Sequence, residues 1–597
     1  MRAKLSRRAA VSAAAAACLA ASPLRAGVAT VPGDPLFDPL LDPRAAACAP
    51  PRTGSMVPLR LAAAAPQAVA EGRATPQQGA VPRYEGLGTL SLRIDTRHRG
   101  AQAYFDQGLR LAFGFNHAEA VRAFREAQRL DPGCAMCFWG EALVLGPNIN
   151  VPMLPQAQAP ALAALDRAVA LKAGARPRDK ALIEALQQRY SADPKAERAA
   201  LDAAYADAMA GVAKRFAADD TVLALAAEAM MDTQPWDYWE PGGAAPKGRG
   251  DEIVRLLETV LKRSPSHPGA IHLYIHAVEA SAAPERALAP ARRLAALTPA
   301  AGHLVHMPSH VYYRLGMYRE SLAANVRAVQ VDERYFETSA SDPLYRSAYY
   351  PHNIHFVMVS AQFGGDGATA VDAAAKLDAS IPEQAAREFA VLQPIKAAPY
   401  TTLALFAAPD QVLRLPAPPP DLALVRALYH YARALAHARL DEPAKAQLEI
   451  DAIGALERGT DFAAFEAWGV PAREVTQIAR LVAVARLADA QGRLDEAAGA
   501  YADAAVIEDK LSYMEPPFWY YPVRQSLGAV YLRQGKLDAA RAVLRESLVK
   551  VRHNGWALAA LVEVERRSGD KRAEAAALQA YRRAWFGPAD GPDLARL

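Results

Sequence analysis

The sequence contains very little cysteine. Only four of its 597 residues are cysteines, too few for a fold held together by a disulfide framework. Stability must therefore come from a packed core, and 52% hydrophobic residues are enough to form one.

A substantial excess of positive charge is also missing. The formal charge is +4, and the first 26 residues contain five cations and no acid, so the remainder carries 4 − 5 = −1. A near-neutral chain gives no electrostatic reason to expect nucleic acid as a partner. The phosphate-binding glycine loop, the Gly-x-Ser-x-Gly elbow and the dinucleotide fingerprint are absent as well, so common nucleotide-cofactor chemistry is not supported.

Long apolar runs are absent beyond the N-terminus. Residues 1–26 have a basic start, an apolar stretch too short to span a bilayer, and small residues before a cleavage point after Ala26. This pattern predicts a signal peptide, and Ser6-Arg7-Arg8 also resembles the twin-arginine signal that exports folded proteins. Either export route gives a periplasmic or secreted protein, and we expect no transmembrane segment in the mature chain.

Composition divides the rest of the chain. Residues 27–90 are rich in Ala, Pro and Gly without a sustained period, which predicts a disordered linker. A Pro-rich stretch at 413–421 is expected to separate a first helical array, 91–412, from a second, 422–597.

The segment from Ala101 to Pro132 resembles the tetratricopeptide repeat. With Ala101 as position 1, the residues typical of this repeat stand at positions 4, 8, 11, 20, 24, 27 and 32, as Tyr104, Gly108, Leu111, Ala120, Phe124, Ala127 and Pro132. Small residues at 8 and 20 let two helices approach, and large ones fill the space between them. A second clear copy begins at Tyr521, and weaker copies are anchored with Pro268, Gly302 and Pro351 as position 1. The resemblance implies an all-α superhelix of antiparallel helix pairs with a concave groove for protein or peptide partners.

Histidines recur at fixed positions in the weak central copies. Positions 2, 5 and 9 of three successive units hold His272, His276, His303, His306, His310, His352 and His355. By the resemblance these positions face the groove, and their spacings of three and four residues independently place them on one helical face. We therefore expect seven histidines in one cavity. Pro308 removes a helical hydrogen bond, so its helix is expected either to kink there or to start near Met307.

The pairs His272/His276 and His306/His310 have the i, i+4 spacing by which one helix offers two imidazoles to a metal. The sequence thus predicts a transition-metal site, for copper, zinc or iron, with His303, His352 and His355 completing it and Glu279 as a candidate ligand or catalytic base. Whether such a site sequesters metal or catalyses a reaction stays open. The alternative is a metal-free scaffold whose groove binds a protein or peptide.

Cys134 and Cys137 lie in the segment CAMCFWG. They are expected either to pair or lie buried at a repeat joint, or to form a second, soft-metal site with Met136. Phe138 stands where a c-type haem site needs histidine, which excludes that cofactor. The aromatic loop around Trp236 is expected either to pack against a repeat edge or to cover the groove.

The motifs CAMCFWG, HMPSHVYY and YYPHNIHF together resemble a group of long bacterial tetratricopeptide-repeat proteins. The resemblance implies the fold but no particular reaction.

Overall fold

The computed structural model describes residues 81–193, 195–339 and 345–597. The expected signal peptide, most of the expected linker and Cys48 lie outside these residues. Within the described ranges the regular structure is helical, apart from one isolated bridge between Trp239 and Pro246. The predicted all-α class is confirmed.

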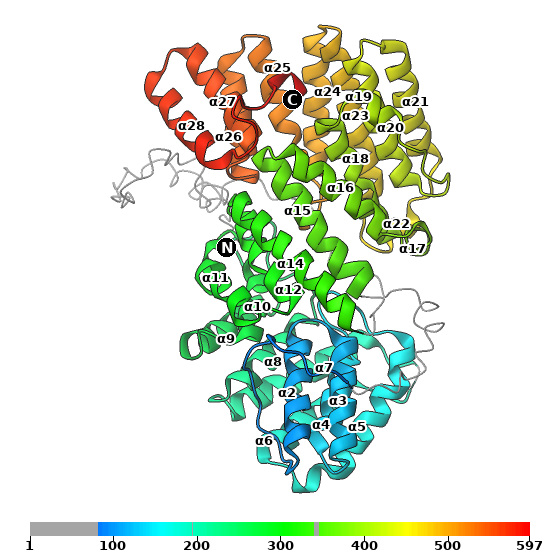
Figure 1. Cartoon of the computed structure of the whole chain (residues 1–597), viewed down its shortest axis with the longest axis vertical. Coiled ribbons are helices and arrows are strands. Elements are labelled where there is room, and N and C mark those ends of the chain that lie inside the picture. Colours follow the sequence, from blue (N-terminus) through cyan, green and yellow to red (C-terminus); the bar gives the residue numbers. More distant parts are fainter. Residues whose placement is uncertain (1–80, 194, 340–344) are drawn as a thin grey trace, which may run out of the picture.

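The helices follow one another in antiparallel pairs joined by short turns (Figure 1). The first group contains α2 (Arg99–Phe113), α3 (His117–Leu130), α4 (Ala135–Val144), α5 (Gln158–Leu171), α6 (Pro177–Leu186), α7 (Arg198–Arg215) and α8 (Asp220–Met231). The central group contains α9 (Gly250–Arg263), α10 (Pro268–Val278), α11 (Leu288–Leu297), α12 (Gly302–His306), α13 (Pro308–Arg314), α14 (Tyr318–Thr338), α15 (Tyr350–Gly364) and α16 (Gly367–Ser380).

The last group completes the chain. It contains α17 (Glu383–Glu388), α18 (Gln393–Phe406), α19 (Pro409–Leu413), α20 (Ala423–Arg439), α21 (Pro443–Gly459), α22 (Ala463–Glu466), α23 (Ala472–Ala490), α24 (Leu494–Glu508), α25 (Val523–Arg533), α26 (Leu537–Lys550), α27 (Gly555–Ser568) and α28 (Lys571–Ala584).

Close packing within the pairs explains the small residues of the repeat. A Cβ atom on Gly108 of α2 would lie 2.7 Å from the ring of Phe124 on α3, and one on Gly528 of α25 would lie 2.6 Å from Leu544 on α26. Both glycines occupy position 8 of a repeat, so the absence of a side chain there lets the paired helices approach. The chain is a solenoid of tetratricopeptide-like helix pairs.

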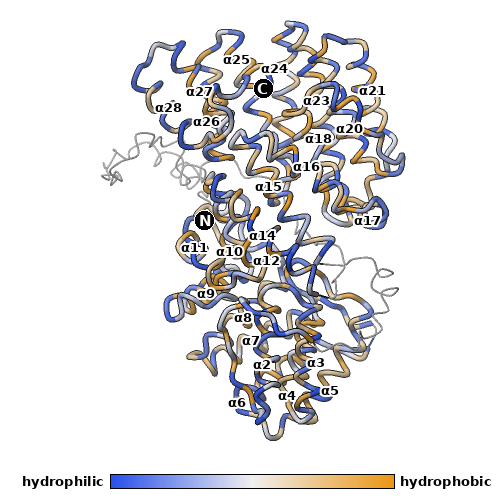
Figure 2. The backbone as a smooth tube through the Cα atoms, viewed as in Figure 1, coloured by the Kyte–Doolittle hydropathy of each residue, from blue (hydrophilic) through white to orange (hydrophobic). Residues whose placement is uncertain are grey.

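Two hydrophobic cores divide the molecule into lobes. One core runs from Leu87 to Tyr349 and the other from Tyr313 to Leu597. In Figure 1 the first lobe occupies the lower half and the second the upper half, with α10 to α15 between them. Hydrophobic and hydrophilic residues alternate along most helices (Figure 2), as amphipathic packing requires. Among the described helices, none has the length and apolar character needed to cross a membrane.

The structure corrects two expected boundaries. Residues 81–90 do not all belong to a disordered linker, because Leu87 is buried and Gln107 Nε2 donates to the carbonyl of Pro82. The Pro-rich stretch 413–421 does not separate two arrays, because α18 packs on α20 across it and one core continues through Val412 and Leu422. The division between cores lies earlier, in α13 to α15.

Candidate metal centre

Three successive repeat units place histidines between the two cores. The first helices of the first two units begin at Pro268 and Gly302, as the repeat numbering predicts. The first helix of the third unit begins at Tyr350, one residue before the expected Pro351. Pro308 breaks the second of them, so that α12 ends at His306 and α13 starts at Pro308. His303 and His306 nevertheless remain helical on α12, and His310 follows on α13.

Six of the seven histidines form two triads. The first triad is His272, His276 and His303, and the second is His306, His310 and His352; in each, one nitrogen per ring lies within 4.8 Å of the others. An i, i+4 pair supplies two members of each triad and a neighbouring unit supplies the third. The two pairs therefore belong to separate triads rather than to one four-histidine site.

The Nε2 atoms approach one another closely. His272 and His303 are 3.2 Å apart at Nε2, His306 and His310 are 2.9 Å apart, and His310 and His352 are 3.4 Å apart. Nitrogens bound to one ion at about 2.0 Å in tetrahedral geometry lie about 3.3 Å apart. These spacings match the edge of such a coordination shell.

Acceptor atoms behind the rings fix which nitrogen is free. Nδ1 of His272 lies 2.6 Å from the carbonyl oxygen of Phe113, and Nδ1 of His306 lies 2.6 Å from Oδ1 of Asn325. Both oxygens only accept, so both rings donate from Nδ1 and keep a lone pair on Nε2. Backing of this kind is typical of metal-bound imidazoles.

Two buried carboxylates back two further rings, His276 and His310. Glu279 accepts from Nδ1 of His276 at 2.9 Å and pairs with Nδ1 of His310 at 2.7 Å. Glu515, from the loop after α24, accepts from the same His310 nitrogen at 3.0 Å. Glu279 therefore holds two imidazoles, one from each triad. This places it as a positioning residue between the triads, although Glu279, His310 and Glu515 are also grouped closely enough to hold an ion themselves.

Burial and nearby charges give the triad histidines different protonation states. Burial, and then neighbouring histidines, lower the pKa of His272, His276, His303, His306 and His352, so that these rings are neutral and free to coordinate. Burial alone would lower the pKa of His310 too, but the carboxylates of Glu279 and Glu515 outweigh it and raise that pKa to about 10. Without a metal, the second triad thus carries a proton at the point where the Nε2 atoms meet.

The structure corrects two further expectations about the histidines. His355 is not part of the cluster: its ring packs against Tyr520 of the second lobe, 5.4 Å between centroids, and it belongs to neither triad. The cluster is also not an open groove. Five of the six triad histidines, His272, His276, His303, His306 and His310, are between 0 and 2% exposed, because both lobes cover them, and His352 is partly exposed.

Two aromatic residues with unusual backbone angles pack their rings against the first triad. Phe115 and Trp236 have φ values of 55° and 65°, in the left-handed region that side chains rarely adopt. The Phe115 ring lies 4.4 Å from that of His272, and the Trp236 ring lies 4.7 Å from that of His276. The aromatic loop therefore covers His276 through Trp236, while Trp239 of the same loop packs against α10 and donates from Nε1 to the carbonyl of Ala277. Non-glycine residues held in this region often mark functional sites.

Two hollows adjoin the cluster. A small cavity of about 30 Å³ is lined by residues of both triads, namely His276, His303, His310 and His352. A larger pocket of about 500 Å³ is also lined by His303, together with Arg110 and Arg334 among others. His303 thus lines both a cavity of water size and a pocket large enough for a small molecule.

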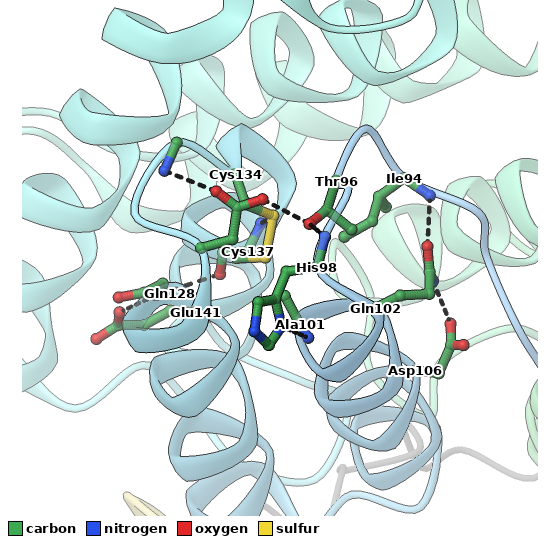
Figure 3. The surroundings of a disulfide bond; sticks show 12 residues. Ile94, Thr96, His98, Ala101, Gln102, Asp106, Gln128, Cys134, Cys137 and Glu141 are labelled. Carbon is green, nitrogen blue, oxygen red and sulfur yellow. Dashed lines mark hydrogen bonds between the residues drawn. A yellow bond between two sulfur atoms is a disulfide. The ribbon is translucent and has the colours of Figure 1, made fainter.

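Cys134 and Cys137 are joined by a disulfide at the start of α4. Figure 3 shows its surroundings, which include His98 and Glu141 but none of the seven histidines discussed above. With both sulfurs bonded to each other, this pair is not a thiolate metal site.

Sequence reasoning missed several contributors. Glu515 lies 205 residues after His310, Asn325 lies on the second helix of a repeat, and Phe115 lies in the turn between α2 and α3. For Glu515, the sequence signals that could have identified it are that it is the acid within the aromatic segment YMEPPFWYY and that the repeat is interrupted there.

No protein-family model matches the sequence, and comparison with curated proteins finds no relative. Among solved structures, the fold is similar to human IFIT1 in a dimer with m7Gppp-AAAA, at 12% identity and a TM-score of 0.28, covering 82% of this chain and 90% of that one. It is also similar to the Cut9–Hcn1 hetero-tetramer of the APC/C (13% identity, TM-score 0.28, 82% and 78% covered) and to yeast Tom70 (12%, 0.26, 81% and 90%). Superpositions this loose carry no functional inference, so the site has to be interpreted from its own residues.

Proposed function

We propose that this chain is an exported helical-repeat protein that binds a transition metal through its buried histidine triads. The observation that carries the proposal is the convergence of Nε2 atoms at 2.9 to 3.4 Å, together with oxygen acceptors at Nδ1 of four of the six rings. His306 and His310 both donate from Nδ1, so the lone pairs on their Nε2 atoms would face each other and repel unless a proton or a metal cation lies between them.

An unpartnered nitrogen supports a metal at the first triad. Nε2 of His276 is buried and has no hydrogen-bond partner, although its Nδ1 is bonded to Glu279. A buried polar atom without a partner costs about 1–3 kcal/mol. Coordination to an ion shared with His272 and His303 removes that cost.

The alternative, a metal-free scaffold that binds a peptide in the groove, is less well supported at these residues. A partner cannot touch the five triad histidines that are at most 2% exposed unless the lobes separate. Binding of a protein elsewhere on the solenoid is compatible with the metal site.

The larger pocket favours metal-dependent chemistry over sequestration. Its volume of about 500 Å³ falls in the range of small-molecule sites, about 300–1,000 Å³, and a protein that only stores metal needs no such space beside His303. We therefore propose that a small organic ligand approaches the metal from this pocket.

Export is proposed from residues 1–26, with periplasmic or secreted location. The disulfide between Cys134 and Cys137 supports it, since such bonds persist mainly in oxidising compartments.

Metal analysis of the untagged full chain tests the proposal. We expect transition metal near stoichiometry in protein isolated from the exported fraction, and its loss in His276→Ala and His310→Ala. His355→Ala is the matched control, because His355 is buried in the same region but belongs to neither triad. Protein that stays metal-free after incubation with copper, zinc and iron salts, or variants that keep wild-type metal content, would refute it.

A further inference from the structure

We propose that the two triads bind two metal ions, one in each, which face each other across the small shared cavity as a dinuclear all-imidazole centre for late first-row transition metals such as copper. This inference rests on the proposed metal-binding function and specifies the nuclearity and class of the site.

Each triad is a complete ligand set by itself. His272, His276 and His303 meet in one place, and His306, His310 and His352 meet in another. Three protein ligands with an open fourth position are typical of catalytic rather than structural metal sites. A single ion would use one triad and leave three imidazoles of the other without a function.

The triads are adjacent. Ring centroids of His276 and His310 are 5.5 Å apart, and those of His303 and His306 are 5.8 Å apart, which falls within the 4.7 to 6.3 Å found inside the triads. The two triads are defined by their nitrogens, since one nitrogen per ring lies within 4.8 Å of the others in each group. Glu279 binds Nδ1 of a ring in each triad. One carboxylate thus fixes the orientation of both ligand sets relative to each other.

The shared cavity lies where open coordination positions are needed. Its lining takes His276 and His303 from one triad and His310 and His352 from the other. A space of about 30 Å³ holds two or three waters, since one water needs about 10–15 Å³ by this measure. Both ions would then share the same solvent molecules.

The donor set indicates the class of ion. Every ligand is an imidazole nitrogen, no thiolate is present at either triad, and the carboxylates of Glu279 and Glu515 are engaged by Nδ1 atoms behind the rings. Imidazole suits copper, zinc, iron and nickel, and copper(II) binds most tightly in this series, whereas oxygen ligands suit calcium and magnesium.

Copper(II) titration of the metal-free full chain tests the pair. We expect two copper ions per chain after desalting, and an electron paramagnetic resonance signal weaker than that of two isolated copper(II) ions, because ions that share bridging solvent couple magnetically. His303→Ala removes one ligand of the first triad and His352→Ala one ligand of the second. Each variant should retain one copper with the full signal of an isolated ion, and His355→Ala should retain two coupled ions. Circular dichroism verifies that the variants are folded.

The outcomes separate the two proposals. If the wild type binds one copper per chain, and the two variants either both lose it or both keep it, the dinuclear centre is overturned and metal binding stands. Two copper ions with the full uncoupled signal place the second ion elsewhere and overturn it too. No bound copper, zinc or iron in the folded wild type overturns metal binding itself.

Discussion

Glu515 reaches His310 across 205 residues of sequence, its Oε2 accepting from Nδ1 of the imidazole at 3.0 Å. His310 lies on α13, where the two cores meet, and Glu515 lies in a loop of the second lobe. The histidine centre is therefore completed only when the second lobe folds over the first, so assembly of the lobes and assembly of the site are one event.

Replacing the shared carboxylate should weaken the metal site without removing a ligand. In Glu279→Gln, the neutral amide no longer holds His276 and His310 by charge-assisted hydrogen bonds. We expect metal affinity to fall about 10- to 100-fold, as for other residues that orient ligands, measured by competition with a chelating dye. Glu285→Gln, on an exposed side chain nearby, is the control. Equal affinities in the two variants would contradict the positioning role.

Two glycines should respond to alanine with opposite signs. Gly108→Ala puts a methyl group 2.7 Å from Phe124, and overpacking of this kind costs about 1–3 kcal/mol. Gly211 lies within α7 with nothing within 4 Å, so Gly211→Ala should gain about 1 kcal/mol from helix propensity. Thermal unfolding of both variants measures the difference. Stabilisation by Gly108→Ala would show that the helix pair is not closely packed there.

The disulfide should be independent of the metal site. Replacing Cys134 and Cys137 with Ser removes the bond at the start of α4, and a loop this short contributes about 2 kcal/mol by chain entropy. We expect a modest loss of thermal stability and unchanged metal content by elemental analysis. Reduced metal content in the folded double variant would show that the sulfurs contribute to metal binding.

Local patterns predicted the helices and the histidine positions, but not what surrounds them. Helical periodicity and repeat numbering depend on nearby residues, so α10 and α12 begin where position 1 was expected and α15 begins one residue earlier. His355 occupies the same repeat position as His272 and His306, yet it packs on Tyr520. That contact, the burial of the triads and the role of Glu515 depend on how the second lobe folds back, which no local pattern encodes.

Asp332 should give the protein a measurable pH dependence of stability. Its carboxylate accepts from Tyr345 Oη at 2.9 Å and Asn353 Nδ2 at 2.7 Å, and Tyr345 in turn accepts from the backbone N–H of His303. Burial raises the pKa of Asp332 from 3.8 to about 7, because no cation offsets the loss of solvent.

The sign follows from proton uptake. Between about pH 4 and pH 7 the folded state keeps a proton on Asp332 that the unfolded state has released, so this group's contribution to stability grows as the pH falls through that window, by up to about 1.4 kcal/mol per unit. Buried neutral histidines act in the opposite direction below about pH 6.5. The informative quantity is therefore the difference in unfolding free energy between wild type and Asp332→Asn, measured by denaturant unfolding of the metal-free proteins from pH 5 to pH 8. We expect that difference to shift in favour of the wild type as the pH falls. The control Asp372→Asn changes an exposed side chain and should give a difference that does not vary with pH. A constant difference for Asp332→Asn would mean that Asp332 is already ionised throughout this pH range.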